Sequence, residues 1–214
     1  HIRKVANEKN IVLVFDEITA GFRLCAGGSH KILGVNPDIA VLAKGMTNGY
    51  PLSAIIGKKD IMEASQSTFI SSTFYTERVG FAATLKSVEV YVRDKVWEKQ
   101  VAYGKKIKSG WLNMAKTYDL DVSVGGIDPL GHFAFNYENQ LAYKTFVTQE
   151  MLKRGYLASN ACYTTGAHSD SIVEEYLTCL SDVFRIIANT IHNGEKIEDK
   201  LQGLKCHEGF ARLL

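Results

Sequence analysis

The sequence predicts an α/β fold in two parts, a mostly parallel sheet with helices followed by a small α+β domain. Three observations lead to this prediction. Short β-branched apolar runs, separated by glycine-rich connections, extend to about residue 57; a long helical pattern follows; strand-like and helical segments then alternate. With 214 residues, 46% of them hydrophobic, the chain can bury a core of its own.

The first part contains three short apolar runs. Residues 1–10 have the pattern of the end of an amphipathic helix, and the runs follow at residues 11–15, 39–43 and 52–56. The length and β-branching of the first run favour a buried parallel strand over a helix, and the second run repeats its pattern. Three strands are too few for a sheet covered on both faces. We therefore expect a partner or a preceding half of the chain to supply the rest, and we favour a fragment of a longer protein.

A helical pattern extends from about residue 77 to residue 118, which is long for one helix. We predict a break near Arg93-Asp94. A stretch of this kind suits a connector between two domains. The predicted division is therefore residues 1–92 for the end of the first domain, 93–118 for the helical connector and 119–214 for the second domain.

The second domain is predicted to mix short strands with two helices. Strands are expected at residues 122–125, 132–135 and 156–163, and helices at residues 139–154 and 172–191. Gly155 is expected just past the end of the first helix, and Ser171 is expected to cap the second. The polar stretch from Asn193 onward is expected to be loosely held.

Composition excludes several classes of function. The net charge of +2, from 25 basic and 23 acidic residues, does not indicate a nucleic-acid or anionic-membrane partner. The four cysteines and six histidines are scattered, so neither a disulfide framework nor a metal site is expected. No apolar run approaches the ~18 residues of a membrane span, and no signal peptide opens the sequence. We expect a cytoplasmic protein.

Ionisable residues stand at the ends of the first two apolar runs. Asp16-Glu17 ends the first run and Lys44 ends the second. Ligands of open α/β sheets bind beyond the carboxyl ends of the strands, so these side chains should converge on one rim. A lysine at the end of a buried strand would be partly desolvated, which favours the neutral amine that Schiff-base chemistry needs. Gly45 would leave space for a planar group. A lysine that extends to solvent past the strand end is an equal alternative.

Asp16 would complement Lys44. A carboxylate at the end of a neighbouring strand can hold a protonated ring nitrogen, as the partner of pyridoxal 5′-phosphate (PLP) does. For an Asp-Glu pair taken alone, a helix cap or a structural salt bridge is the favoured alternative. The combination of Asp16 with Lys44 therefore carries more weight than either residue alone.

The motifs around these residues resemble those of class III aminotransferases of PLP fold type I. They are Val-Phe-Asp16-Glu-Ile-Thr-Ala-Gly-Phe-Arg23, Gly34-Val-Asn-Pro-Asp38, Leu-Ala-Lys44-Gly-Met and Gly49-Tyr-Pro-Leu-Ser-Ala54. The sequence is most similar to the glutamate-1-semialdehyde aminomutase branch, which the 28 residues between Asp16 and Lys44 suit. The likeness extends to the Ala167–Asp170 segment. It implies the C-terminal part of a PLP-transferase large domain, followed by the family's small C-terminal domain.

The resemblance assigns roles to four residues. Lys44 would form the Schiff base with PLP and shuttle a proton, and Asp16 would hold the pyridinium nitrogen. Ile18 would pack on the ring face, although an isolated Ile is ordinarily a core residue. Thr73 would contact the cofactor phosphate, usually that of the neighbouring subunit, although a Ser/Thr cluster is more often a turn. A homodimer with a shared active site is therefore expected.

The sequence departs from the family pattern at three places. Thr76-Glu77-Arg78 replaces the usual Gly-Asn-Pro after the phosphate-binding threonine. Thr19 stands where many members have Gln near the cofactor hydroxyl. Residues 155–169 contain no arginine, whereas many class III transaminases place a carboxylate-binding Arg in this region. The last departure argues against an ordinary α-amino acid bound there and is compatible with the aminomutase-like branch.

The main prediction is a PLP-dependent aminotransferase or aminomutase that acts on a small-molecule amino donor and acceptor. A racemase or decarboxylase of the same fold is an alternative, because class III relatives share the lysine and the aspartate. A non-catalytic assembly partner is another, although a scaffold has no evident need for both Lys44 and Asp16. The residues do not identify the substrate.

Overall fold

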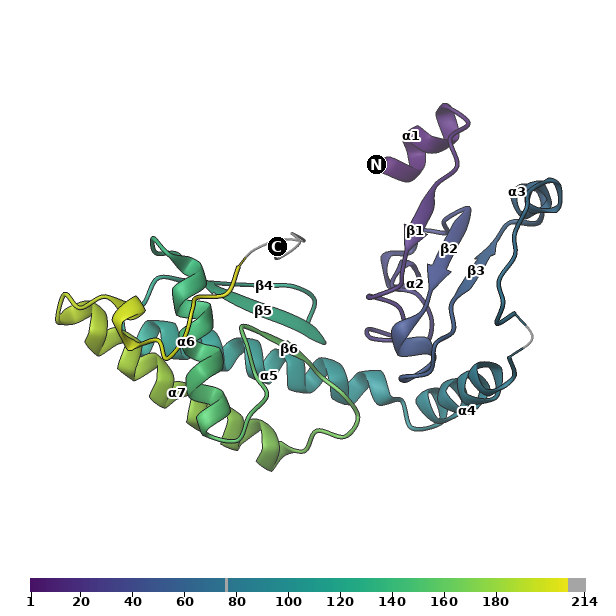
Figure 1. Ribbon diagram of the computed structural model, residues 1–214. Coiled ribbons are helices and arrows are strands. Elements are labelled where there is room, and N and C mark those ends of the chain that lie inside the picture. The colour runs from purple at the N-terminus through teal and green to yellow at the C-terminus, as the bar shows by residue number, and fades with distance from the viewer. Residues whose placement is uncertain (76, 208–214) are drawn as a thin grey trace. The chain divides into compact units, whose positions relative to one another are not determined.

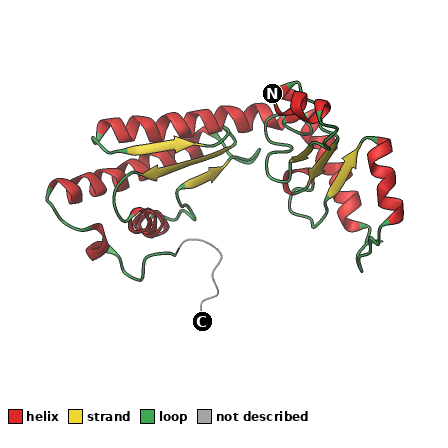
Figure 2. Ribbon diagram, turned by 90° about the horizontal axis from the view of Figure 1, so that it is seen from above, coloured by secondary structure: helices red, strands yellow, loops and turns green. Residues whose placement is uncertain are grey.

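The computed structural model describes residues 1–75 and 77–207 (Figure 1). The chain forms two compact units, His1–Gln100 and Val101–Leu214. Each unit has a three-stranded sheet of its own, and Figure 2 shows the strands in two separate groups. No helix in the described part of the chain is long and apolar enough to cross a membrane.

The sheet of the first unit is mixed. It consists of β1 (Val14–Asp16), β2 (Ile39–Leu42) and β3 (Ala54–Gly57) in the order β1-β2-β3. β1 and β2 are parallel, as predicted, with Asp16 opposite Val41. β3 is antiparallel to β2, because the connection between them is too short for the crossover of a dozen or more residues that a parallel strand requires.

One expectation about this sheet is wrong. The first strand was expected to be buried, yet Val14 is 50% exposed. Ile55 and Ile56 of β3 are also more than half exposed. By strand register, Val14 and Ile55 lie on one face of the sheet, and no layer of the described chain covers that face. Ile56 lies on the opposite face, where Leu42 joins a small core with Phe22, Met46 and Tyr91.

Helices surround this sheet. They are α1 (Ile2–Glu8), α2 (His30–Leu33), α3 (Lys59–Met62) and α4 (Val79–Arg93), with 3-10 turns η1 (Lys44–Met46) and η2 (Glu63–Ser67). The buried carboxylate of Asp38 joins α1 to the sheet, because it accepts hydrogen bonds from the Arg3 side chain and the Leu13 amide at 2.8 Å. It also pairs with Lys58 at 2.7 Å. The Leu13 amide, Lys58 and Arg3 hold the pKa of Asp38 well below its usual range.

The long helical stretch is divided as the sequence predicts. α4 ends at Arg93 and α5 runs from Val96 to Thr117. Lys95, between them, has a left-handed φ of 45°, which interrupts the helical path. The break lets Tyr91 contact the ring of Trp97, with centroids 5.5 Å apart. The division at residues 92 and 118 stays a prediction.

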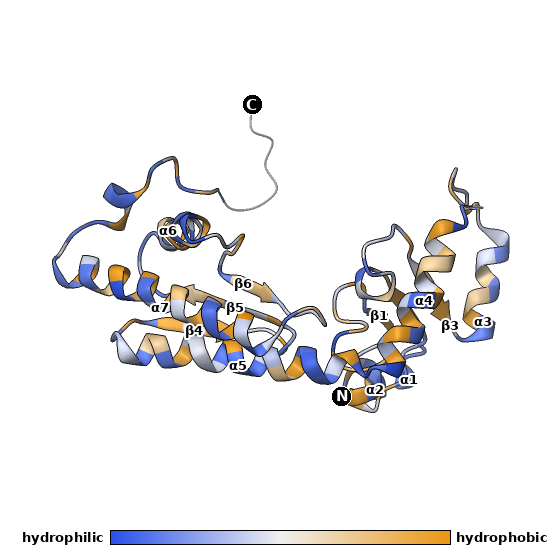
Figure 3. Ribbon diagram, turned by 90° about the horizontal axis from the view of Figure 1, so that it is seen from below, coloured by the Kyte–Doolittle hydropathy of each residue, from blue (hydrophilic) through white to orange (hydrophobic). Residues whose placement is uncertain are grey.

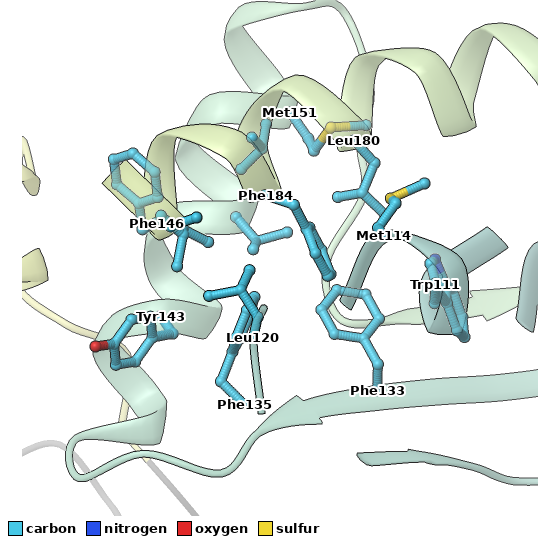
Figure 4. Close-up of a cluster of buried hydrophobic side chains, with 14 of the residues drawn as sticks. Trp111, Met114, Leu120, Phe133, Phe135, Tyr143, Phe146, Met151, Leu180 and Phe184 are labelled. Carbon is cyan, nitrogen blue, oxygen red and sulfur yellow. The ribbon is translucent and has the colours of Figure 1, made fainter. Parts of the chain in front are cut away.

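The second unit packs helices on an antiparallel sheet. Its strands are β4 (Val122–Gly125), β5 (Leu130–Phe135) and β6 (Ala161–Tyr163). Its helical elements are α6 (Gln140–Lys153), α7 (Asp170–His192), η3 (Ile197–Lys200) and the part of α5 from residue 101 onward. Hydrophobic and hydrophilic residues alternate along α7 (Figure 3). Figure 4 shows Trp111, Phe133 and Phe184 gathered in the core, where the ring centroids of Phe133 and Phe184 are 5.5 Å apart.

Three details of the second unit differ from the prediction. Only residues 161–163 of the expected strand 156–163 form a strand. The side chain of Ser169, not Ser171, caps α7 by accepting a hydrogen bond from the Ile172 amide. Residues 193–207 are held rather than loose, and residues 208–214 lie outside the described residues. Ile197 is buried in the core, and Gln149 exchanges hydrogen bonds with the Lys200 carbonyl and the Gln202 amide.

Candidate active site

Asp16 and Lys44 lie at the same edge of the first unit's sheet. Asp16 is the last residue of β1, and Lys44 begins the turn that follows β2. The two strands are parallel and adjacent, so their carboxyl ends share one rim. Both side chains are exposed there. The predicted convergence of the two strand ends is therefore present.

The amine of Lys44 is held by Thr19. Lys44 Nζ donates a hydrogen bond to Thr19 Oγ1 at 2.6 Å, and it has no other side-chain partner among the described residues. The partial desolvation expected of Lys44 is wrong for this chain, because the residue is exposed. Nothing in the described part of the chain covers the rim above it.

The backbone of Lys44 is in the left-handed region, with φ 46°. A residue with a Cβ costs about 1–3 kcal/mol in such a conformation, and strain of this kind concentrates at functional sites. The turn keeps the conformation because the Lys44 carbonyl accepts hydrogen bonds from the amides of Thr47 and Asn48, both at 3.1 Å. Lys44 is one of several described non-glycine residues with a positive φ, and it is the one that the sequence singles out for chemistry.

Gly45 has a different role from the one expected. It was predicted to leave space for a planar ligand. A Cβ on Gly45 would instead lie 3.0 Å from the carbonyl oxygen of Gly21 and 3.3 Å from that of Phe22. The turn after β1 fills this space. Gly45 therefore allows the two turns at the rim to pack against each other.

The neighbouring acids Asp16 and Glu17 have separate environments. Asp16 Oδ1 accepts a hydrogen bond from the Ile18 amide at 3.0 Å, and Oδ2 has no partner within the described ranges. Glu17 is 1% exposed and accepts hydrogen bonds from Ser29 Oγ and the His30 amide at 2.9 Å. Burial alone would raise the pKa of Glu17, but the hydrogen bonds from Ser29 and His30 outweigh it and lower the pKa. Asp16 is thus available to a ligand, whereas Glu17 is structural.

The other two predicted site residues, Ile18 and Thr73, lie in separate turns. Ile18 is half-buried in the turn directly after Asp16. Thr73 lies in an exposed turn before α4, and no described hydrogen bond joins it to Asp16 or Lys44. Thr76 lies outside the described residues.

Glu77, part of the departure from the family pattern, lies just before α4. Its carboxylate accepts hydrogen bonds from the amides of Val79 at 2.7 Å and Gly80 at 3.0 Å. These hydrogen bonds lower the pKa of Glu77, and the one from Gly80 has the larger effect. The acid therefore satisfies two amides that the helix itself leaves unpaired. The sequence did not reveal this role.

The donor set fits PLP. The cofactor needs a primary amine that can bond its carbonyl carbon and a carboxylate beside its ring nitrogen. Within the described residues, Lys44 supplies an exposed amine whose only side-chain partner is Thr19, and Asp16 supplies a carboxylate with one oxygen unengaged. No three His, Cys, Asp or Glu side chains gather to hold a metal ion in the described part of the chain. The groups at the rim suit an organic carbonyl cofactor.

The fold and this rim define an α/β protein of the class III aminotransferase type, and comparison with known proteins agrees. The model of the family described as "Aminotransferase class-III" matches residues 1–167. The chain therefore belongs to this family. It is 35% identical over 159 residues to a glutamate-1-semialdehyde 2,1-aminomutase of Methanococcoides burtonii, covering 73% of this chain and 37% of that protein. It is 32% identical over 149 residues to a 3-aminobutyryl-CoA aminotransferase of Cloacimonas acidaminovorans, and the match covers 69% of this chain and 36% of that protein.

Solved structures confirm the predicted fold class. The FumI protein of Sphingopyxis sp. MTA144, solved in its PLP internal aldimine form, matches with a TM-score of 0.82 at 23% identity over 89% of this chain and 46% of that one. An omega-transaminase of Sphaerobacter thermophilus matches with a TM-score of 0.78 at 19% identity, over 88% and 47%. The chain spans less than half the length of each relative named here.

Proposed function

We propose that this protein is a PLP-dependent aminotransferase or aminomutase and that Lys44 bonds the cofactor. The observation that supports this most is the placement of Lys44 and Asp16 at the carboxyl ends of adjacent parallel strands. The family membership of the chain agrees with it. PLP, when bound, supplies an electron sink that stabilises negative charge on a substrate carbon.

Each rim residue then has a task. Lys44 would hold the cofactor through its amine, and the same amine would accept and return a proton at the substrate carbon. Asp16 would hold the cofactor's protonated ring nitrogen through its carboxylate, one oxygen of which accepts a hydrogen bond from the Ile18 amide. Ile18 would supply an apolar side chain beside the cofactor.

The experiment is an absorbance spectrum of the full-length protein. We expect a near-visible band that disappears on reduction with borohydride and leaves PLP attached to the peptide that contains Lys44. Lys44→Ala should abolish the attachment. The matched control is Lys31→Ala, since Lys31 is also exposed and hydrogen-bonds only the Ala26 carbonyl. An attached cofactor in Lys44→Ala, or none in the wild type, would overturn the proposal.

We further propose a homodimer in which Thr73 contacts the cofactor phosphate of the second copy. The segment before α4 is apolar and exposed: Phe69 is 96% exposed and Phe74 is 75% exposed. Side chains of this kind are costly in water and are typical of surfaces that pack on a partner. Light scattering should give twice the chain mass, and Phe74→Asp should shift it toward the monomer. A monomeric wild type at micromolar concentration would contradict the proposal.

The type of reaction is decided by product analysis. A transaminase consumes a 2-oxo acid acceptor, an aminomutase needs none, and a racemase or decarboxylase returns no transferred amino group. The relatives include both transaminases and aminomutases. The absence of arginine in residues 155–169 favours an amino compound without an α-carboxylate at that position. Turnover of ordinary α-amino acids in preference to amino aldehydes or amino sugars would contradict this.

We also propose a cytoplasmic location. The four cysteines are all free in the structure, as thiols are in a reducing compartment. Fractionation of the native cells should place the protein with soluble cytoplasmic enzymes. Recovery from the periplasm or from membranes would contradict the proposal.

A further inference from the structure

We propose that Thr19 is a positioning residue that holds the amine of Lys44 in place before the cofactor binds. The inference rests on the proposed function of Lys44. Its central observation is the hydrogen bond from Lys44 Nζ to Thr19 Oγ1 at 2.6 Å. This bond joins the turn after β2 to the turn after β1, the two connections that form the rim.

Thr19 is well placed to hold another side chain, because its own turn is fixed. Just before Thr19, the Ile18 amide donates a hydrogen bond to the Asp16 carboxylate. The carbonyl of Thr19 accepts a hydrogen bond from Arg23 Nε at 3.1 Å. Thr19 is half-buried, and its branched Cβ restricts rotation of the hydroxyl. A rigid acceptor therefore faces a flexible lysine.

Lys44 needs such a partner. A lysine side chain has many rotamers, and an exposed one loses this freedom only where a specific contact holds it. No ion pair of Lys44 exists among the described residues, and the Thr19 hydroxyl is the single group that its amine reaches. The left-handed backbone sets the direction in which the side chain leaves the turn. The hydroxyl then fixes where the amine ends, at the turn that follows β1.

The test compares Thr19→Val, which keeps the branched shape without the hydroxyl, with Thr19→Ser, which keeps the hydroxyl. The full-length protein is stripped of cofactor and labelled with an amine-reactive ester, and the ratio of label at Lys44 to label at Lys31 is measured by peptide mass spectrometry. Because the wild-type amine is engaged by one hydrogen bond of ordinary strength, the ratio of label at Lys44 to label at Lys31 should be about two- to tenfold higher in Thr19→Val. Thr19→Ser should match the wild type.

The second readout is the rate at which stripped protein captures added PLP, followed by near-visible absorbance. Thr19→Val should capture it about two- to tenfold more slowly, because the amine is no longer held in place. Thr19→Ala should behave like Thr19→Val and replaces it if the valine variant does not fold. Circular dichroism melting confirms that the compared variants are folded.

The outcomes separate the two proposals. If the wild type captures no PLP, the proposed function fails, while the labelling ratio still reports on the contact with Thr19. If wild type and Thr19→Ser capture PLP but Thr19→Val equals them in both readouts, Lys44 keeps its function and the positioning role is overturned. The role is also overturned if Thr19→Ser shows the same change as Thr19→Val, since the lost feature would then not be the hydroxyl.

Discussion

The buried carboxylate of Glu17 lies against the start of α2, where it accepts hydrogen bonds from Ser29 Oγ at 2.9 Å and from the His30 amide at 2.9 Å. The residue before it, Asp16, is exposed at the rim of the sheet. Successive side chains at a strand end point to opposite sides. One acid of the pair is therefore used by the fold, and the other remains free for a ligand.

Glu17→Gln should destabilise the first unit. The amide has one acceptor oxygen in place of two, and its NH2 group would face the donors of Ser29 and His30. An unsatisfied buried polar group costs about 1–3 kcal/mol. Urea unfolding measures the free energy of unfolding. The unfolding is monitored by the fluorescence of Trp97 in a Trp111→Phe background, since Trp97 packs in the first unit. Asp16→Asn is the matched control, expected to change stability by less than about 0.5 kcal/mol. Equal losses in both variants would contradict the assignment.

The stabilising effect of Glu17 should depend on pH. Because the pKa of Glu17 is lower in the folded chain, its contribution is complete above the unfolded value of about 4.3. It is lost as the pH falls through the folded pKa. The difference in unfolding free energy between the parent and Glu17→Gln should therefore shrink as the pH falls from about 4.3 through the lower pKa of the folded state. A difference that stays constant over this range would show that the charge of Glu17 is not involved.

Lys44→Gly should be more stable than Lys44→Ala in the protein without cofactor. Glycine adopts the left-handed φ of Lys44 without strain, whereas alanine retains a cost of about 1 kcal/mol. At Lys31, which lies in the helix α2, the order should be reversed, because glycine is less favourable than alanine in a helix. Thermal melting of the four variants measures both differences. The same order at both positions would show that Lys44 is not held in the left-handed conformation.

Gly45→Ala should destabilise the first unit by about 1–3 kcal/mol, the usual range for an overpacked site. The added Cβ would press on the carbonyl oxygen of Gly21 at 3.0 Å, and backbone cannot move aside as a flexible side chain can. Gly203→Ala is the control, since nothing lies within 4 Å of its added Cβ. Urea unfolding measures the free energy of unfolding of both variants and of the wild type. A stable Gly45→Ala variant that fails to capture PLP would restore the original expectation that this glycine makes room for the ligand.

Local pattern was sufficient for several features. The apolar run at residues 39–43 correctly located β2, and the run at 11–15 overlaps β1, which begins only at Val14. The rule that parallel strands end at one rim correctly brought Asp16 and Lys44 to the same edge. The break near Arg93 and the helix α6 were also correct. These features depend on composition and periodicity within a short segment, which a sequence displays directly.

Other features depend on contacts between distant segments. The exposure of Val14 follows from the lack of a covering layer in the described chain. The separate roles of Asp16 and Glu17 depend on where α2 begins. The bond between Lys44 and Thr19, which are 25 positions apart, required the register of two strands and the shapes of two turns.

For this protein, the sequence alone determined which residues we propose for binding a carbonyl cofactor, because residue type and position in a strand are local properties. Only the tertiary structure decided how Lys44 is held. Its left-handed backbone and its hydrogen bond to Thr19 exist because two turns from different strands pack against each other at Gly21 and Gly45. No pattern within either segment contains that contact.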